Sequence, residues 1–146
     1  MNIIRFAAIA LFIQLSVVSF AQICWLKPEN PKVTDTVTLY FNAAEGNRAL
    51  ADQPGDVYIH TGVITNKSMD AHDWKYVIGN WGKDDQSLKM KREGKNLYSF
   101  RFVINSFYML RPEDVVNQLV YVCRNMDGSR VGKTKNNEDM TVAVNG

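Results

Sequence analysis

The chain has 146 residues, which is enough for one domain and leaves no room for a second. It carries 17 Lys and Arg against 15 Asp and Glu, a formal net charge of +2, and the opposite charges are interspersed. A balance this close to neutral gives no electrostatic basis for binding nucleic acid, so we expect no nucleic-acid partner.

Residues 1–21 have the pattern of a secretory signal peptide. Arg5 supplies the positive charge, an apolar run covers 6–18, and Ser19 and Ala21 place small residues at the −3 and −1 positions of a cleavage site after Ala21. The apolar run is shorter than the roughly 20 residues that a membrane-spanning helix needs. We therefore expect export to the periplasm, the cell surface or the extracellular medium, membrane contact only through the signal segment, and a mature domain at 22–146. A retained N-terminal anchor is the alternative.

The rest of the chain consists of short candidate strands separated by turn residues, with almost no helical periodicity. Strands are predicted at 25–26, 36–41, 56–63, 74–79, 87–91, 96–104, 118–124 and 140–144. One helical turn is expected within 106–114, before Pro112. Short strands without βαβ alternation predict an all-β protein. An immunoglobulin-like β-sandwich of about seven to eight strands is the first choice, and another Greek-key sandwich or barrel is the second.

Cys24 and Cys123 lie near opposite ends of the expected mature domain. Export makes a disulfide between them chemically possible, and the alternative is two small buried hydrophobic residues. Two cysteines and two histidines without close spacing do not suit a structural zinc site. The polar loop at 42–56 carries oxygen donors that suit Ca²⁺, but its spacing does not match an EF-hand, and solvated loop acids are the default interpretation.

The sequence contains none of the common catalytic motifs: no nucleophile elbow, phosphate-binding loop, zinc-protease motif or dinucleotide-binding motif. A carboxylate pair for glycoside hydrolysis cannot be recognised in the sequence, because acidic residues are common and the distance between two of them depends on the fold. A cleft-forming hydrolase built from short strands in so small a domain would be unusual. We therefore expect a non-enzymatic protein without a cofactor, and a small hydrolase is the weaker alternative.

A histidine beside an aromatic residue points to recognition of a sugar. In the strand at 56–63, Val57 and Ile59 are natural core residues, so Tyr58 and His60 are expected on the opposite, exposed face. An aromatic ring stacks on the apolar face of a pyranose, and an imidazole hydrogen-bonds to hydroxyl groups. The alternative for both side chains is packing beneath a loop.

The next strand raises the same question. If Val77 faces the core, Trp74 and Tyr76 are exposed together and form a stacking platform, with Lys75 available to hydrogen-bond to hydroxyl groups. The alternative is that Trp74 is the core tryptophan that such sandwiches often contain. Trp81 lies between glycines on a predicted turn, where the backbone can approach a ligand, and is therefore a further candidate contact.

Two segments carry a resemblance to a known group of proteins. Gly-Asp-Val-Tyr-Ile-His-Thr-Gly-Val-Ile-Thr at 55–65, followed by Asp-Trp-Lys-Tyr-Val at 73–77, resembles a domain of secreted glycan-utilisation proteins from Bacteroidetes-type bacteria. More distantly, it is similar to the immunoglobulin-like starch-binding modules of extracellular amylases, which share a Val-Tyr-x-His-x-Gly strand followed by a tryptophan. The segment 120–129 is similar to the closing strand and turn of that family, where a hydrophobic or aromatic residue is more usual than Cys123.

The resemblance extends over most of 33–144 and implies a site. By matching position, His60 and Trp74 contact the sugar, and Trp81 stands in for a third aromatic residue on a nearby loop. The insert at 64–73 is longer than in those modules and can reshape the site. The resemblance also implies a partner that is a glycoside hydrolase or an outer-membrane glycan-uptake protein.

The first hypothesis is therefore a non-catalytic glycan-binding module for a polysaccharide, with starch or another α-glucan as the expected ligand. Trp74 and Trp81 stack on the sugar, and His60 and Lys75 hydrogen-bond to its hydroxyl groups. The alternative is a structural or interaction domain of a secreted or surface glycan-utilisation protein, in which the aromatic residues belong to the core.

Overall fold

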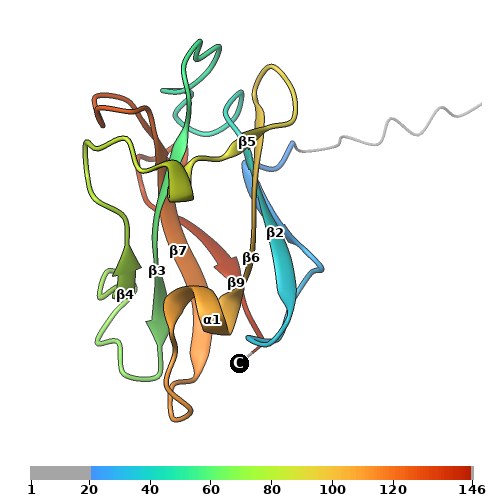
Figure 1. Cartoon of the computed structure of the whole chain (residues 1–146), viewed down its shortest axis with the longest axis vertical. Helices are drawn as coiled ribbons and strands as arrows, with labels where there is room; N and C mark the ends of the chain where they lie inside the picture. Colours follow the sequence, from blue (N-terminus) through green and yellow to red (C-terminus); the bar gives the residue numbers. More distant parts are fainter. Residues whose placement is uncertain (1–20, 146) are drawn as a thin grey trace, which may run out of the picture.

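The computed structural model describes residues 21–145, which form two facing antiparallel β-sheets (Figure 1). The first sheet has the order β1-β2-β6-β5, with β1 at Cys24–Lys27, β2 at Thr36–Asn42, β6 at Leu97–Val103 and β5 at Lys91–Arg92. The second has β4 (Lys75–Ile78), β3 (Tyr58–Thr65) and β7 (Val116–Arg124), and β7 also pairs with β8 (Val131–Gly132) and β9 (Met140–Ala143). The two helical elements are a 3-10 turn, η1 (Gln86–Leu88), and a short helix, α1 (Ile104–Tyr108). The predicted all-β character is confirmed.

The core lies between the two sheets and follows from alternation along the central strands. In β2, Val37, Leu39 and Phe41 are buried, while the residues between them are partly exposed. Val57 and Ile59 are completely buried, which confirms their predicted place in the core. Full burial of one such side chain contributes roughly 1.5–3 kcal/mol, so these inward-facing rows are a main source of stability.

Two elements differ from their predicted form. The segment 87–91, predicted as a strand, contains the last two residues of the 3-10 turn η1 and only the first residue of the two-residue strand β5. The Asp85 carboxylate accepts a hydrogen bond from the backbone N–H of Ser87 at 3.1 Å, and this local bond competes with strand pairing. The predicted helical turn begins earlier, at Ile104 directly after β6, and its Phe107 ring lies 4.7 Å from that of Phe102.

The two cysteines are free thiols in the structure. Cys123 is buried with its Sγ 3.5 Å from the Sδ of Met90, and the half-buried Cys24 directs its thiol to the backbone oxygen of Thr141 at 3.9 Å. Burial raises the pKa of the Cys123 thiol, which therefore stays neutral. The arrangement matches the alternative in which both residues pack as small hydrophobic side chains.

The predicted signal peptide falls on residues that lie, except for Ala21, outside the described part of the chain. Among residues 21–145, no helix is long and apolar enough to cross a membrane.

Candidate functional site

Three of the residues singled out in the sequence meet on the outer face of the second sheet. His60 comes from β3, Trp74 directly precedes β4, and Trp81 follows β4. The His60 ring lies 6.1 Å from that of Trp74, at an interplanar angle of 35°, and 5.4 Å from that of Trp81, at 88°. We call these three residues the aromatic cluster.

Two glycines make room for this cluster. A Cβ atom on Gly62 would lie 2.9 Å from the backbone oxygen of Lys75, so a side chain there would push the backbone that follows Trp74 away from β3, and it would also touch the Cβ of Trp74 at 3.4 Å. Gly79 has a φ of 128°, and a Cβ on it would lie only 2.6 Å from Nδ1 of His60. The small size of glycine is therefore needed at both positions, and its conformational freedom is needed at Gly79.

The structure separates Tyr76 from Trp74. The pairing of β3 with β4 shifts register between Thr61 and Val63, and Tyr76 has a left-handed φ of 52°, so simple alternation fails here. Val77 is 51% exposed instead of facing the core, while Tyr76 packs against the core. The expected exposed platform of Trp74 and Tyr76 is therefore wrong.

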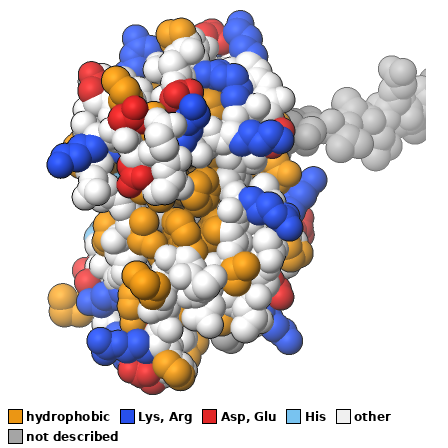
Figure 2. Space-filling view, viewed as in Figure 1, with side chains coloured by type: hydrophobic (Ala, Val, Ile, Leu, Met, Phe, Trp, Pro, Cys, Tyr) orange, Lys and Arg blue, Asp and Glu red, His pale blue; other side chains and the backbone are white. Residues whose placement is uncertain are grey.

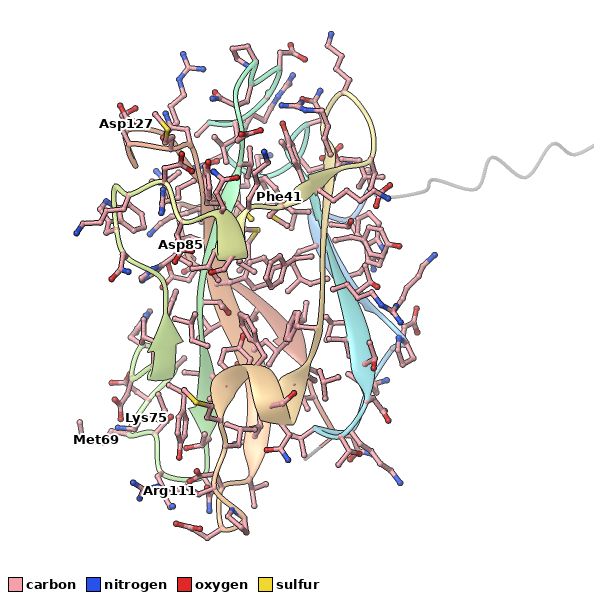
Figure 3. All side chains as sticks on the ribbon, in the orientation of Figure 1. Phe41, Met69, Lys75, Asp85, Arg111 and Asp127 are labelled. Atoms are coloured by element: carbon pink, nitrogen blue, oxygen red, sulfur yellow. The ribbon has the colours of Figure 1, made fainter. Side chains whose placement is uncertain are left out.

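Lys75 and Tyr76 belong to an ionic group at one end of the sandwich. Their side chains line a cavity of about 380 Å³ together with Lys67, Arg111 and Asp114, and Figure 3 shows Lys75 and Arg111 at this end of the molecule. Tyr76 Oη donates to Asp114, and Lys75 pairs with Asp73. The hydrogen bonds from Lys67 and Tyr76 lower the pKa of Asp114 to about 2. The Lys75 ammonium is thus engaged by Asp73 and stands apart from the aromatic cluster.

Tyr58 lies on the outer side of β3 but is buried, which corrects the prediction that it is exposed. Only 1% of the residue is accessible. Its hydroxyl donates to Oδ1 of Asp84 at 2.5 Å and accepts from Nε2 of Gln86 at 3.3 Å. Tyr58 therefore packs beneath a loop, which is the alternative to exposure on the strand.

Arg124, at the end of β7, is the central residue that the sequence analysis missed. It is completely buried, and its two terminal nitrogens donate to four backbone oxygens at 2.7–3.0 Å. The acceptors are the carbonyls of Asn80, Lys83, Asn125 and Met126. One guanidinium group therefore ties the loop that carries Trp81 to the turn after β7. The only available signal was an arginine directly after the apolar run at 119–123.

Two aromatic rings also support the Arg124 charge. Its guanidinium carbon lies 5.2 Å from the centre of the Tyr58 ring and 5.9 Å from that of Trp81. Within residues 21–145, no carboxylate pairs with it. Carbonyl dipoles and ring faces thus replace the usual counter-ion.

The same environment keeps His60 neutral. Burial, and secondarily the charge of Arg124, lower the pKa of its imidazole. Its Nδ1 is buried and has no hydrogen-bond partner among the described residues. Nε2 is therefore the ring nitrogen that remains for a ligand. The nearest aromatic neighbours of His60 are the rings of Trp74 and Trp81.

Trp81 provides the main accessible surface of the cluster, with 50% of the residue exposed, while His60 and Trp74 are partly exposed. A Cβ on Gly128 would lie 2.7 Å from Nε1 of Trp81, so one edge of the indole rests on the turn after β7. On the face seen in Figure 2, hydrophobic side chains gather across the middle and many charged ones lie toward the ends, where loops join the strands. Trp81 can therefore offer a ring to a ligand close to a polar loop region.

The acids of the loop at 42–56 do not converge. Asp52 binds Asn96 and Lys95, whereas Asp56 pairs with Lys89 at 3.0 Å. Throughout residues 21–145, no group of three or more His, Cys, Asp or Glu side chains is placed to hold a metal ion.

The fold and the cluster define a two-sheet all-β domain with a half-exposed tryptophan supported by a buried arginine. No protein-family model matches the chain, and no curated protein sequence matches it.

Proposed function

We propose that this protein is a non-catalytic glycan-binding module that takes starch or a similar α-glucan. The observation that carries the proposal is the convergence of His60, Trp74 and Trp81 with half of Trp81 exposed. A half-exposed indole on a rigid support suits stacking against the apolar face of a pyranose. The Arg124 hydrogen bonds hold that support in place, which reduces the entropy lost on binding.

The proposal includes an immunoglobulin-like connectivity. The sheet orders β1-β2-β6-β5 and β4-β3-β7 support this connectivity, since an immunoglobulin domain with strands A-B-E-D in one sheet and C′-C-F-G in the other would have the same order, with β9 as the last strand and β8 as a short addition along β7. It also includes export, on the strength of the signal-like segment at 1–21, and action beside a glycoside hydrolase or an outer-membrane glycan-uptake protein, which the resemblance of the segments 55–65 and 73–77 implies.

Affinity electrophoresis of residues 22–146 tests the function. The protein is run through gels that contain soluble starch, glycogen, xylan or laminarin, next to Trp74→Ala and Trp81→Ala. Trp25→Ala is the matched control, because Trp25 stacks on Tyr40 at 5.1 Å in the first sheet, apart from the cluster.

We expect starch to retard the wild type and Trp25→Ala, and Trp81→Ala to migrate as in a gel without polysaccharide. Equal migration of all proteins in every gel would refute the glycan-binding function.

A structural or interaction domain is the second candidate, and one observation favours it. The outer face of β7 is buried as well as its inner face: Val120 and Arg124 are completely inaccessible, and Val122 is 4% exposed. Trp81 therefore covers part of this face whether or not it binds a sugar. Under this alternative, replacing Trp81 lowers the stability of the fold, and no polysaccharide is retained.

A further inference from the structure

A cavity of about 390 Å³ lies at the end of the sandwich that holds the turn after β7. We call it the loop pocket. Its walls come from the loop at 53–56, from Tyr58 and Asp84, and from the turn residues 125–127. Figure 3 shows Asp127 at this end, opposite Lys75 and Arg111. The volume falls within the range of roughly 300–1,000 Å³ that small-molecule sites occupy.

Two arginines fix the walls of the loop pocket. Arg124 donates to the backbone oxygens of Asn125 and Met126 at 3.0 and 2.7 Å. Arg92 donates to the backbone oxygens of Gln53 and Gly55 at 2.9 and 2.8 Å. The pocket is therefore formed before any ligand arrives, which lowers the entropic cost of binding.

The loop pocket adjoins the aromatic cluster through two close backbone approaches. Gly128 leaves room for the edge of Trp81, because a Cβ there would lie 2.7 Å from Nε1 of the indole. Gly82 faces the same turn, and a Cβ on it would lie 3.3 Å from the backbone oxygen of Asp127. Asp127 lines the pocket, so the turn that it belongs to separates Trp81 from the cavity.

The polar groups of the pocket suit hydroxyl groups. Asp84 accepts from Tyr58 through Oδ1, and its Oδ2 has no hydrogen bond among the described residues. Asp127 accepts through Oδ1 from the N–H and hydroxyl of Ser129 at 3.0 and 2.7 Å. The amide of Gln53 adds a donor at the wall, whereas the amide of Asn125 is engaged by Ser129 and by the backbone of Arg130.

The charged side chains that line the cavity are all acidic, and the guanidinium groups of Arg92, Arg124 and Arg130 hydrogen-bond to residues of its walls without lining it. Asp56, Asp84 and Asp127 line it, and no lysine or arginine does so. Lys89 neutralises Asp56 at 3.0 Å, which leaves Asp84 and Asp127 without an ion pair within residues 21–145. The hydrogen bonds from Ser129 lower the pKa of Asp127, which is therefore ionised at neutral pH. An anionic group entering here would meet two carboxylates.

We propose that the loop pocket binds the sugar unit next to the one stacked on Trp81, and that Asp84 and Asp127 exclude glycans that carry carboxylate or sulfate groups. This inference rests on the proposed function and narrows its ligand to neutral glycans. Carboxylate oxygens accept hydrogen bonds from sugar hydroxyls, whereas the same oxygens repel a negatively charged substituent.

The test compares soluble starch with carboxymethyl starch, which has the same α-glucan backbone and added carboxylates. Dissociation constants for both polymers are measured by titration calorimetry at low salt with the wild type and with Asp84→Asn/Asp127→Asn. Each asparagine keeps Oδ1 as an acceptor, so the bonds to Tyr58 and Ser129 survive. The control is Glu29→Gln/Glu113→Gln, which changes the net charge equally at exposed sites outside the pocket.

We expect the wild type to bind carboxymethyl starch at least about tenfold more weakly than starch. The ratio of the dissociation constants for carboxymethyl starch and starch should fall below about threefold in Asp84→Asn/Asp127→Asn. In the control it should stay at the wild-type value. Two results would overturn this inference and leave the proposed function standing. In the first, the wild type binds starch and carboxymethyl starch equally well. In the second, the pocket variant binds starch and still rejects carboxymethyl starch as strongly as the wild type does. Absence of starch binding by the wild type overturns both.

Discussion

The guanidinium carbon of Arg124 lies 5.9 Å from the centre of the Trp81 ring, so a buried positive charge supports the one half-exposed indole of the aromatic cluster. The same group donates to carbonyls of the Trp81 loop and of the turn after β7. A cation over an indole face contributes about 0.5–2 kcal/mol. The orientation of Trp81 and the stability of the second sheet are therefore coupled.

Replacing Arg124 with methionine should destabilise the fold strongly. The variant leaves the carbonyls of Asn80, Lys83, Asn125 and Met126 without their donor. Unpaired buried polar groups cost about 1–3 kcal/mol each, and partial solvation of the loosened loops limits the total to roughly 3 kcal/mol. Urea unfolding followed by tryptophan fluorescence measures the loss. Arg101→Met, an exposed arginine of the first sheet, should change stability by less than about 0.5 kcal/mol. Equal effects of the two substitutions would contradict the role of Arg124.

Replacing Gly79 with alanine should disturb the aromatic cluster. Its φ of 128° is unfavourable for a residue with a side chain, and the new Cβ would collide with the His60 ring. We expect a loss of about 1–3 kcal/mol in the free energy of unfolding, with weaker starch retention. Gly94→Ala is the control, because its nearest neighbour would be a Leu97 carbon at 3.9 Å. Wild-type behaviour of Gly79→Ala would show that the cluster does not need this close approach.

Stability should decrease with falling pH because of His60. Burial and Arg124 lower the pKa of the folded-state imidazole, whereas in the unfolded chain the pKa is about 6.5. Below that pH the unfolded state binds a proton that the folded state does not, so the stability present above about pH 6.5 is lost as the pH falls toward the folded-state pKa. Urea unfolding at several pH values should give a steeper decline for the wild type than for His60→Gln. His72→Gln removes the exposed histidine and should follow the wild type.

Replacing Tyr76 with alanine should lower stability and leave starch binding intact. Tyr76 packs against the core and donates to Asp114 in the ionic group that includes Lys75. We expect a lower Tm for the variant in thermal unfolding, and wild-type retardation by starch at a temperature where the variant is folded. If a folded Tyr76→Ala protein were no longer retarded by starch, Tyr76 would belong to the binding site after all.

Alternation in the sequence was enough to place the central strands and the core. Val57 and Ile59 were assigned to the core correctly because the chain is extended as it enters β3, and extended residues alternate their faces. The same rule failed at Tyr76, where a left-handed residue and a register shift turn the side chain to the other face. Such a bulge depends on pairing with a neighbouring strand and has no local signature here.

The sequence by itself determined that the chain forms an all-β domain and that His60, Trp74 and Trp81 deserve testing together. Only the tertiary structure decided which side chains are accessible: Tyr58 is buried beneath a loop, and Trp81 is half exposed. It also revealed Arg124, whose acceptors at Asn80 and Lys83 are about forty residues away along the chain. Periodicity reports the faces of one strand, whereas burial and hydrogen bonding between loops depend on contacts between distant segments, which no local pattern contains.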